Sequence, residues 1–442
     1  MRPASLAVLT VSLSLVAVAL GVIAVRVLSG DSTPQDTPTT EALASPTPTP
    51  GISGPTGTAA GPAEHEGARA LAIVQELAKE PRVSGTAGEV RAAEYISGLF
   101  RSYGYATELM QFEVDGDRFR AGEVSVSGRA IEALTLAGSP GGKVQGTAVY
   151  DGLADAAGLA GKDLKGKVAV ADRGTLNFVD KYGNVKDAGA IGLVLVNNRP
   201  GPFSGNLTTL AAFPVVSVSQ EDGAAVLEAA KAGQPIAIDA PSTAGLTKAL
   251  NVIAKPSSSS ECKILVGGHF DSVPSAPGAN DNASGTANVL ELARAAAADG
   301  LDDGLCFASF GAEESGLYGS KALVARMQAE GALPRFMVNL DVTGIGKGVE
   351  VIGEGQLARD AIARAAAVGI PAVASQLPAN SGSDHQSFND AGVPTVFFTS
   401  GDFSTIHSPQ DVSADISEAM LDQVGDVALA VVKDLLLQVA RG

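Results

Sequence analysis

The second half of the chain alternates between short apolar segments and helical patterns, and this alternation is the strongest constraint on its fold. The apolar segments that predict strands are LNVIAKP, KILVGGHF, LCFASFG, FMVNLDV and TVFFTS. Helical spacing covers residues 284–299, 316–330, 355–368 and 417–440. Alternation of this kind predicts an α/β fold, with a mostly parallel central sheet and helices on both of its faces.

A β-rich segment precedes this region. Residues 69–80 and 89–103 show helical spacing, and short valine-rich strands then follow from about residue 132, with one helical pattern at 179–189. The β-rich segment therefore reads as a unit inserted into the α/β domain. The predicted domains are 67–130 and 246–442 for the two parts of the α/β domain, and 131–245 for the insertion.

Composition narrows the class of protein. A chain of 442 residues is too long for one ordinary core, which agrees with more than one folded unit. The formal net charge of -17 argues against nucleic acid as a partner, because a polyanion would be repelled. No partner protein is evident from the sequence.

The N-terminus has the character of an export segment. Residues 6–25 carry no charge and are numerous enough to span a bilayer, while Arg2 and Arg26 flank them and leave the orientation open. We therefore predict an export signal or membrane anchor over 1–30, and a disordered stalk rich in Pro, Ser and Thr over 31–66. The folded part would be extracellular or at the cell surface, membrane-bound if the segment is uncleaved.

Two cysteines, Cys262 and Cys306, each open an apolar predicted strand. Export makes a disulfide possible, and neighbouring parallel strands would bring the two together. Two buried free thiols are the alternative.

Carboxylates and imidazoles collect where the predicted strands end. Ligands of such sheets gather beyond the carboxyl ends of the strands. His269 and Asp271 close one strand, and Asp281 lies in the loop that follows. The next strand ends are followed by Glu313 and Glu314, by Asp341, and by His407.

Carboxylates gathered without neighbouring Lys or Arg would repel one another, and bound cations would relieve that repulsion. Two imidazoles with carboxylates suit zinc. So many donors favour two Zn²⁺ ions bridged by one carboxylate, about 3.5–4 Å apart, with one glutamate left over as a general base. Taken singly, each residue has an ordinary explanation as a solvated or turn-capping side chain. His65 is read in that ordinary way.

The segments GGHFDS, GANDNASG, GAEESGLYGS, NLDVTG, SDHQSF and IHSPQD resemble the co-catalytic di-zinc aminopeptidases of the zinc exopeptidase superfamily. The likeness covers about residues 67–130 and 246–442. It implies that Asp281 bridges both metals, that His269 and Asp341 complete one site, and that Glu314 and His407 complete the other.

The same resemblance implies further roles. Glu313 would be the general base, and Asp271 would orient His269. The Asp281–Asn282 peptide would be cis. Asp384 would bind the substrate amine and His385 would lie beside it. Many members carry a tyrosine that stabilises the oxyanion where this chain has Ile406, and Tyr318 is a candidate neighbour.

The insertion resembles a protease-associated (PA) domain, through LKGKVAVADRGTLNFVDKYGNVKDAGAIGLVLVNN and FPVVSVSQEDG, as in vacuolar and secreted aminopeptidases. Such domains shape access to the cleft or bind substrate.

These features predict an exported zinc aminopeptidase, which removes N-terminal residues from peptide substrates using water activated by two zinc ions. A carboxypeptidase would need arginines for the substrate carboxylate, and the motifs contain none. A glutaminyl cyclase commonly holds one zinc. A non-catalytic peptide-binding receptor would not require intact ligands and base.

Overall fold

The structure is a computed structural model, and it describes residues 64–114, 120–201, 203–207, 209–241, 247–257, 261–301, 303–353, 355–377 and 381–441. The predicted export segment and residues 31–63 of the predicted stalk lie outside these ranges. Within the described residues, no helix has the length and apolar character that crossing a membrane requires.

An eight-stranded sheet forms the centre of the α/β domain. Its strand order is β1 (Tyr105–Val114), β9 (Thr247–Pro256), β11 (Leu305–Phe310), β10 (Ile264–His269), β12 (Phe336–Leu340), β15 (Thr395–Gly401), β13 (Gly346–Ile352) and β14 (Ala372–Ser375). The central strands β11, β10, β12 and β15 run parallel, whereas β9 and β13 pair antiparallel to them. The predicted α/β fold is confirmed, with antiparallel pairing added toward both edges.

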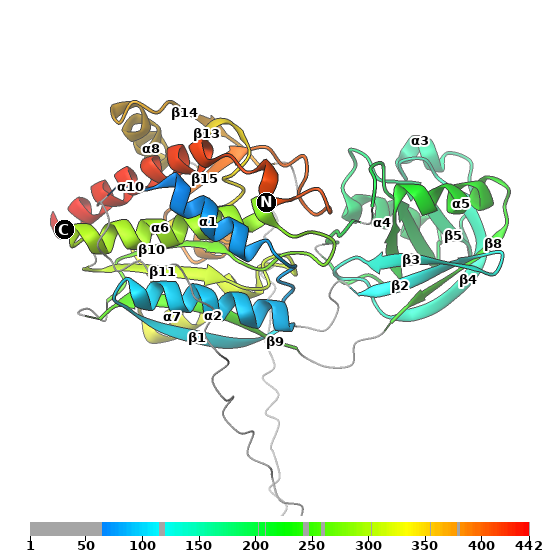
Figure 1. Cartoon of the computed structure of the whole chain (residues 1–442). Helices are drawn as coiled ribbons and strands as arrows, with labels where there is room; N and C mark the ends of the chain where they lie inside the picture. Colours follow the sequence, from blue (N-terminus) through cyan, green and yellow to red (C-terminus); the bar gives the residue numbers. More distant parts are fainter. Residues whose placement is uncertain are drawn as a thin grey trace, which may run out of the picture. The chain divides into compact units, whose positions relative to one another are not determined.

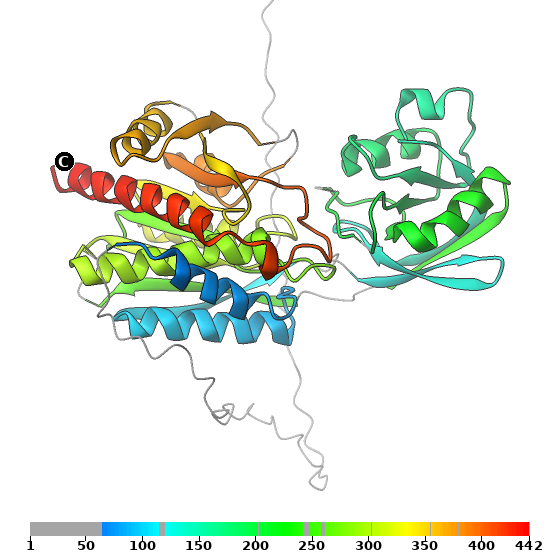
Figure 2. The same ribbon diagram turned by 45° about the horizontal axis from the view of Figure 1, so that its top comes forward.

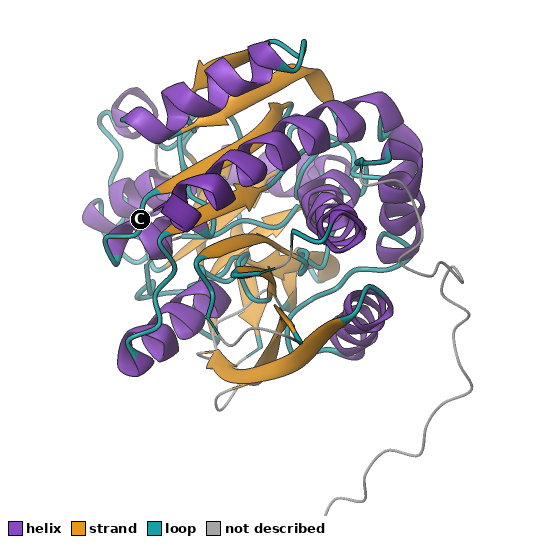
Figure 3. Cartoon of the chain, turned by 90° about the vertical axis from the view of Figure 1, so that its left-hand side faces the viewer, coloured by secondary structure: helices purple, strands orange, loops and turns teal. Residues whose placement is uncertain are grey.

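Helices cover both faces of this sheet (Figure 1, Figure 3). One face carries α1 (Gly67–Leu77), α2 (Ala87–Ser102), α6 (Ser284–Asp299), α8 (Gln356–Ala367) and α10 (Glu418–Arg441). The other carries α7 (Tyr318–Glu330) and α9 (His385–Asp390). Alternate residues of β10 enter the two cores, Val266 on the first face and Leu265 on the second. Burial on both sides explains why this strand reads as a continuous apolar run.

The insertion forms a closed barrel. Around it run β2 (Ala121–Val126), β3 (Arg129–Thr135), β7 (Val215–Val218), β6 (Gly192–Val196), β5 (Val168–Asp172), β4 (Gly142–Tyr150) and β8 (Pro235–Ala240). The barrel segment carries α3 (Ala156–Leu159), α4 (Phe178–Asp187) and α5 (Gln220–Lys231). In the sequence, the barrel segment lies between β1 and β9. These two strands pair antiparallel, from Tyr105 opposite Pro256 to Val114 opposite Thr247.

The sequence predicts one helix in the insertion, at 179–189, and the structure has it as α4. The short α3 and the longer α5 also form there and were not predicted. Gly223 interrupts the helical pattern of α5 in the sequence. In the structure, a Cβ atom at this position would lie 2.3 Å from Val196 Cγ1, so the glycine is what lets α5 pack closely against β6. The residue that weakens the helical signal is therefore required by the packing.

Cys262 and Cys306 form a disulfide, with their Cα atoms 5.5 Å apart. The bond joins the segment just before β10 to the second residue of β11, and the two strands pair in parallel with Leu265 opposite Cys306. Of the two alternatives left open by the sequence, the structure has the disulfide. It ties together the two strands that lead to His269 and Glu314.

The helices α1 and α10 lie side by side on the first face (Figure 2). Gly67 begins α1, and a Cβ atom there would lie 2.5 Å from the Glu418 carbonyl oxygen, so a larger residue would separate the two helices.

Candidate metal centre

The carboxyl ends of the parallel strands bring the predicted ligands together. His269 is the last residue of β10, Asp341 directly follows β12, and Glu314 and His407 lie in the loops after β11 and β15. Asp281 comes from the loop between β10 and α6. Their ligand atoms form two groups that share Asp281, and within each group all atoms lie within 4.8 Å of one another.

The spacing of these atoms fits a pair of bound cations. His269 Nε2 lies 3.2 Å from Asp281 Oδ1 and 3.3 Å from Asp341 Oδ1. His407 Nε2 lies 3.1 Å from Asp281 Oδ2 and 2.9 Å from Glu314 Oε2. Ligands at 2.0–2.2 Å from a tetrahedral zinc ion stand about 3.3 Å apart. Asp281 thus offers one oxygen to each group, as a bridging carboxylate does.

Unsatisfied buried oxygens support the same reading. Within the described residues, Asp341 Oδ1 and Glu314 Oε1 are buried and accept no hydrogen bond. Buried carboxylate oxygens without a donor are costly unless a cation neutralises them. The donor set therefore fits zinc.

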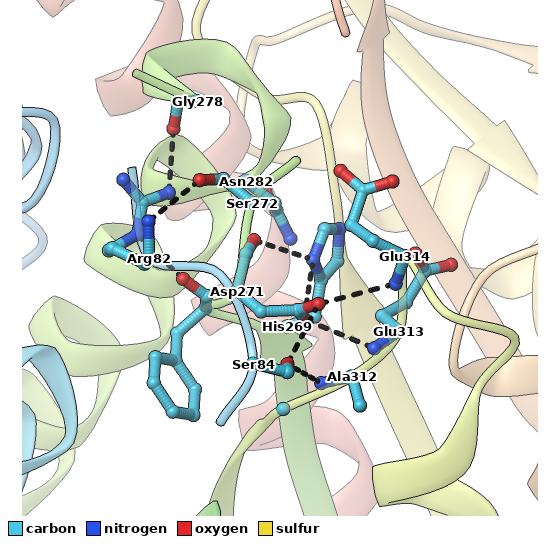
Figure 4. Close-up of polar contacts among 12 residues, drawn as sticks. Arg82, Ser84, His269, Asp271, Ser272, Gly278, Asn282, Ala312, Glu313 and Glu314 are labelled. Atoms are coloured by element: carbon cyan, nitrogen blue, oxygen red, sulfur yellow. Dashed lines mark hydrogen bonds and ion pairs between the residues drawn. The ribbon is translucent and has the colours of Figure 1, made fainter. Parts of the chain in front are cut away.

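Asp271 holds both the His269 ring and the backbone of the two neighbouring glutamates (Figure 4). The His269 Nδ1 lies 3.2 Å from the Asp271 carbonyl oxygen, which leaves Nε2 free to face the carboxylates. The Asp271 carboxylate accepts the backbone N–H of Glu313 at 3.1 Å and that of Glu314 at 3.4 Å. It also accepts the Ser84 hydroxyl at 3.4 Å. One carboxylate thereby holds the backbone of both glutamates.

The loop that carries Asp281 is fixed on two sides. The Asp411 carboxylate accepts the backbone N–H groups of Asn280, at 2.6 Å, and of Asp281, at 3.0 Å. Asn282 is fully buried, and its Oδ1 accepts the Val342 N–H at 3.2 Å. The Asp281–Asn282 peptide is cis, as the resemblance predicts.

Arg82 is a residue of the centre that sequence reasoning missed. Its guanidinium is buried and donates to the carbonyl oxygens of Leu77, Phe270, Pro277 and Gly278, at 2.9, 2.6, 2.6 and 2.8 Å. Figure 4 shows the bond to Gly278. Three of these acceptors lie in the loop between His269 and Asp281, and Leu77 ends α1, so the guanidinium joins that loop to α1. The only signal in the sequence is a single cation in a turn-rich segment, PRVSGTAG.

Burial lowers the pKa of Arg82 to about 10, and the negative charges of Asp411, Asp271, Asp281 and Glu314 oppose that shift. The guanidinium therefore remains charged at neutral pH. It supplies one fixed positive charge beside the carboxylates without pairing directly with any of them.

Backbone strain also gathers at this edge of the sheet. Ala312, Val342 and His407 have φ of 54°, 53° and 57°, in the left-handed region that residues with side chains rarely adopt. Ala312 precedes Glu313, and Val342 follows Asp341. Strain of this kind persists where surrounding contacts hold residues in place for function.

Burial and neighbouring charges shift the pKa values of several side chains of the centre. Burial raises the pKa of Glu314 to about 7, with Asp281 adding to the shift. Burial likewise raises that of Asp384 to about 7 and raises the pKa of Glu313. Burial opposes protonation of His407, but Glu314 and Asp281 outweigh it and raise the imidazole pKa. Without cations, the centre therefore retains protons.

The other predicted residues lie deeper or apart. Asp384 is fully buried, and the His385 ring lies 4.9 Å from that of Phe397, where burial lowers the pKa of His385 to about 4. Their substrate-binding roles stay predictions. Tyr318 packs with the apolar cluster around Phe112.

Ser383 also belongs to the centre, and the sequence reading did not single it out. Its hydroxyl donates to Asp341 Oδ2 at 2.7 Å and accepts from Asn339 Nδ2 at 2.8 Å. This chain of bonds fixes the carboxylate of one predicted ligand.

The inserted barrel reaches the centre through one loop. Asn206 Nδ2 donates to the Glu314 carbonyl oxygen at 3.2 Å, and the Ser204 N–H donates to the His407 carbonyl oxygen at 3.4 Å. Both acceptors belong to predicted ligands of the same group.

Comparisons with known proteins agree with this geometry. The profile of peptidase family M28 matches residues 251–432, and that of the PA domain matches 143–226. Aminopeptidase YwaD of Bacillus subtilis (strain 168) is 32% identical over 378 residues, which are 80% of this chain and 80% of the relative. The chain belongs to peptidase family M28.

Two further relatives extend the comparison. The structure of BSAP, a zinc aminopeptidase from Bacillus subtilis, aligns with a TM-score of 0.74 at 28% identity, covering 84% of this chain and 95% of that one. The probable lipoprotein aminopeptidase LpqL of Mycobacterium tuberculosis (strain ATCC 25618 / H37Rv) is 29% identical over 59% of this chain and 55% of its own length. Both the enzyme class, a peptidase, and the inserted PA domain are thereby confirmed.

We expect Arg82→Met to lower the free energy of unfolding and the zinc affinity more than Arg82→Lys does. Methionine leaves buried carbonyl oxygens without donors, at about 1–3 kcal/mol each, and removes the positive charge, whereas lysine keeps the charge. Urea unfolding and competition for zinc with a chelator measure the two effects. Equal zinc affinity in both variants and wild type would show that Arg82 does not position the loop.

The metal-free protein should lose stability as the pH rises. Glu314 and Asp384 have folded pKa values of about 7, above those of unfolded carboxyls, so their contribution is complete below about pH 4 and is lost as pH rises through 7. The raised pKa of His407 acts in the same direction. Thermal unfolding with chelator should show a Tm lower by on the order of 5 °C at pH 8 than at pH 5. With zinc present, this decline should disappear.

Proposed function

We propose that this peptidase is an exported zinc aminopeptidase, which uses two zinc ions and a glutamate base to remove N-terminal residues from peptides. The observation that carries the proposal is Asp281, whose two oxygens face two separate groups of donors. Relatives named as aminopeptidases support the reaction, and one of them is named as a zinc enzyme.

His269, Asp281 and Asp341 would hold one ion, and Asp281, Glu314 and His407 the other. Bound zinc would supply Lewis acidity for the scissile carbonyl and for water, which suits a centre that has Ile406 where many members have a tyrosine. The surrounding residues fix the ligands: Ser383 holds Asp341, and Asp271 holds the backbone at Glu314.

Glu313 would take the proton of the attacking water and return it to the leaving amine. Its backbone is fixed by Asp271, and its side chain is partly exposed, so substrate can reach it. Burial and neighbouring carboxylates raise the pKa of Glu313, the direction that suits a group exchanging protons near neutral pH.

The charge around the centre favours the amino end of a peptide. Besides the proposed ligands, the partly exposed Glu313 and the fully buried Asp384 would add negative charge that attracts an α-ammonium. A carboxypeptidase would need arginines, yet the guanidinium of Arg326 pairs with Glu108 and that of Arg364 with Asp434, away from the centre. Arg82 is buried against carbonyl oxygens.

Export rests on the uncharged segment 6–25, on the Cys262–Cys306 disulfide, and on the likeness to a protein named as a probable lipoprotein aminopeptidase. Disulfides persist in oxidising compartments. The inserted barrel would shape access to the centre, since its loop contacts the backbone of Glu314 and His407.

A panel of peptides and aminoacyl chromophores tests the reaction. We expect cleavage of substrates with a free α-amine, at least tenfold less for N-acetylated ones, and loss of activity with chelator that zinc restores. Preference for N-blocked peptides with a free carboxylate would instead identify a carboxypeptidase. No turnover by the zinc-loaded chain would favour a receptor.

Glu313→Gln tests the proposed base. The amide cannot accept the proton, so kcat should fall by about 10²–10⁴-fold while KM and zinc content stay close to wild type. Glu330→Gln, at the exposed end of α7, is the matched control. Undiminished kcat in Glu313→Gln would exclude the residue as the base.

A further inference from the structure

A third group of ligand atoms lies outside the centre, where the start of the described chain meets α10. His65, Asp422 and Asp426 each offer one atom, and these atoms lie within 4.8 Å of one another, the same spacing that unites the two groups at the centre. Asp422 and Asp426 stand one helical turn apart on α10, so both carboxylates point from the same side of the helix. The proposed peptidase reaction does not use any of these residues.

The His65 ring is buried between Gly425 of α10 and Asn288 of α6. Its side chain is fully buried, and a Cβ atom at Gly425 would lie 2.2 Å from its Nε2, so only glycine at this position of α10 leaves room for the ring. Nε2 lies 3.1 Å from Asn288 Oδ1. Asn288 uses its Nδ2 to donate to Thr343 Oγ1 at 3.2 Å, which leaves the Oδ1 as acceptor for the His65 Nε2–H.

With the proton on Nε2, the lone pair of His65 Nδ1 faces the carboxylates. This is the arrangement of metal-binding histidines, whose second ring nitrogen donates to a carbonyl oxygen. The Nδ1 lies 3.4 Å from Asp422 Oδ1, which already accepts the Gly67 N–H at 2.8 Å. That separation is long for a charge-assisted hydrogen bond, about 2.7–2.9 Å, but matches the edge of about 3.3 Å between ligands of a tetrahedral ion.

Asp426 completes the group. It is partly buried and, within the described residues, forms no hydrogen bond or ion pair. Burial raises the pKa of Asp426, and the charges of Asp422 and Glu64 raise it further, while His65 opposes the shift. Asp426 therefore adds a negative charge that lacks a cationic partner of its own.

We propose that His65, Asp422 and Asp426 form a third divalent-cation site, distinct from the peptidase centre. One imidazole nitrogen and two carboxylates suit Zn²⁺ or Mn²⁺, with water completing the coordination. Ca²⁺ is disfavoured, because it takes oxygen ligands almost exclusively.

A cation here would fasten the beginning of the folded chain to its last helix. The same segment is already held where Arg294 donates to the Glu64 carbonyl oxygen at 2.6 Å and where the Glu66 N–H donates to Glu291 at 3.2 Å. Because residues 64–66 are the end of the predicted stalk and directly precede α1, a bound ion would strengthen the junction between the tether and the enzyme. An ion that binds only the folded state also raises its stability.

Metal counting on the full chain tests the site. The protein is stripped with chelator, equilibrated with Zn²⁺ buffered below the millimolar range, and analysed for zinc per chain by mass spectrometry. We expect wild type to hold one equivalent more than Asp426→Asn or His65→Gln. Asp434→Asn, on the same helix but paired with Arg364, is the control that should keep the full count. Mn²⁺ alone is the second probe.

Thermal unfolding gives an independent measure. Added Zn²⁺ should raise the Tm of wild type more than that of Asp426→Asn, while turnover by the two stays equal. Equal zinc counts in wild type and both variants would overturn the proposal, as would zinc binding that appears only at millimolar cation. The proposal would also fail if the variants unfolded at a Tm below that of wild type by the same amount with and without cation. That result would indicate a His65–Asp422 ion pair alone. Failure of the peptidase centre to bind zinc would lower every count equally and leave the difference between variants intact.

Discussion

The mutual repulsion of buried carboxylates at one sheet edge is the constraint on which the rest of the structure depends. Glu314, Asp281 and Asp341 are buried beyond the carboxyl ends of parallel strands, and the partly exposed Glu313 adjoins Glu314. No single element could hold these groups together against their charge. Each is therefore fixed by its neighbours: Asp271 by backbone N–H groups of the glutamates, and the Asp281 loop by Asp411 and Asn282.

The way Arg82 contributes explains how the centre stays receptive to cations. A salt bridge to any ligand would compete with a metal for its oxygen. The Arg82 guanidinium instead donates its hydrogen bonds to carbonyl oxygens of the loop. Its positive charge therefore acts on the carboxylates at a distance, and the ligand oxygens stay available to a metal ion. Hydrogen bonds hold the strained backbone at Ala312, Val342 and His407. The Ala312 N–H donates to Ser84 Oγ at 2.8 Å, and the Val342 N–H donates to Asn282 Oδ1 at 3.2 Å. The His407 carbonyl oxygen accepts the Ser275 hydroxyl at 3.1 Å.

Sequence reasoning reached the parts of the molecule whose signals are local. The apolar run ending in His269 predicts both a buried strand and a ligand at its end, and the structure has that strand as β10. Reasoning from pattern failed where packing decides. Among the elements that were not predicted are α5, α9 and β1. Gly223 interrupts the helical pattern of α5, and α9 spans only six residues. The edge strand β1 mixes exposed and buried positions without strict alternation. Arg82 and Ser383 were missed, and His65 was read as an ordinary residue, because the partners of all three are distant in the chain and become neighbours only in the fold.

The continuous pairing of β1 with β9 has a consequence for the history of such chains. Because Val114 stands opposite Thr247, the polypeptide leaves and re-enters the large sheet at adjacent points. A short hairpin turn in the place of the whole barrel would preserve the register of every other strand. A single insertion or excision at this junction would therefore add or remove the whole barrel without changing the pairing of the large sheet.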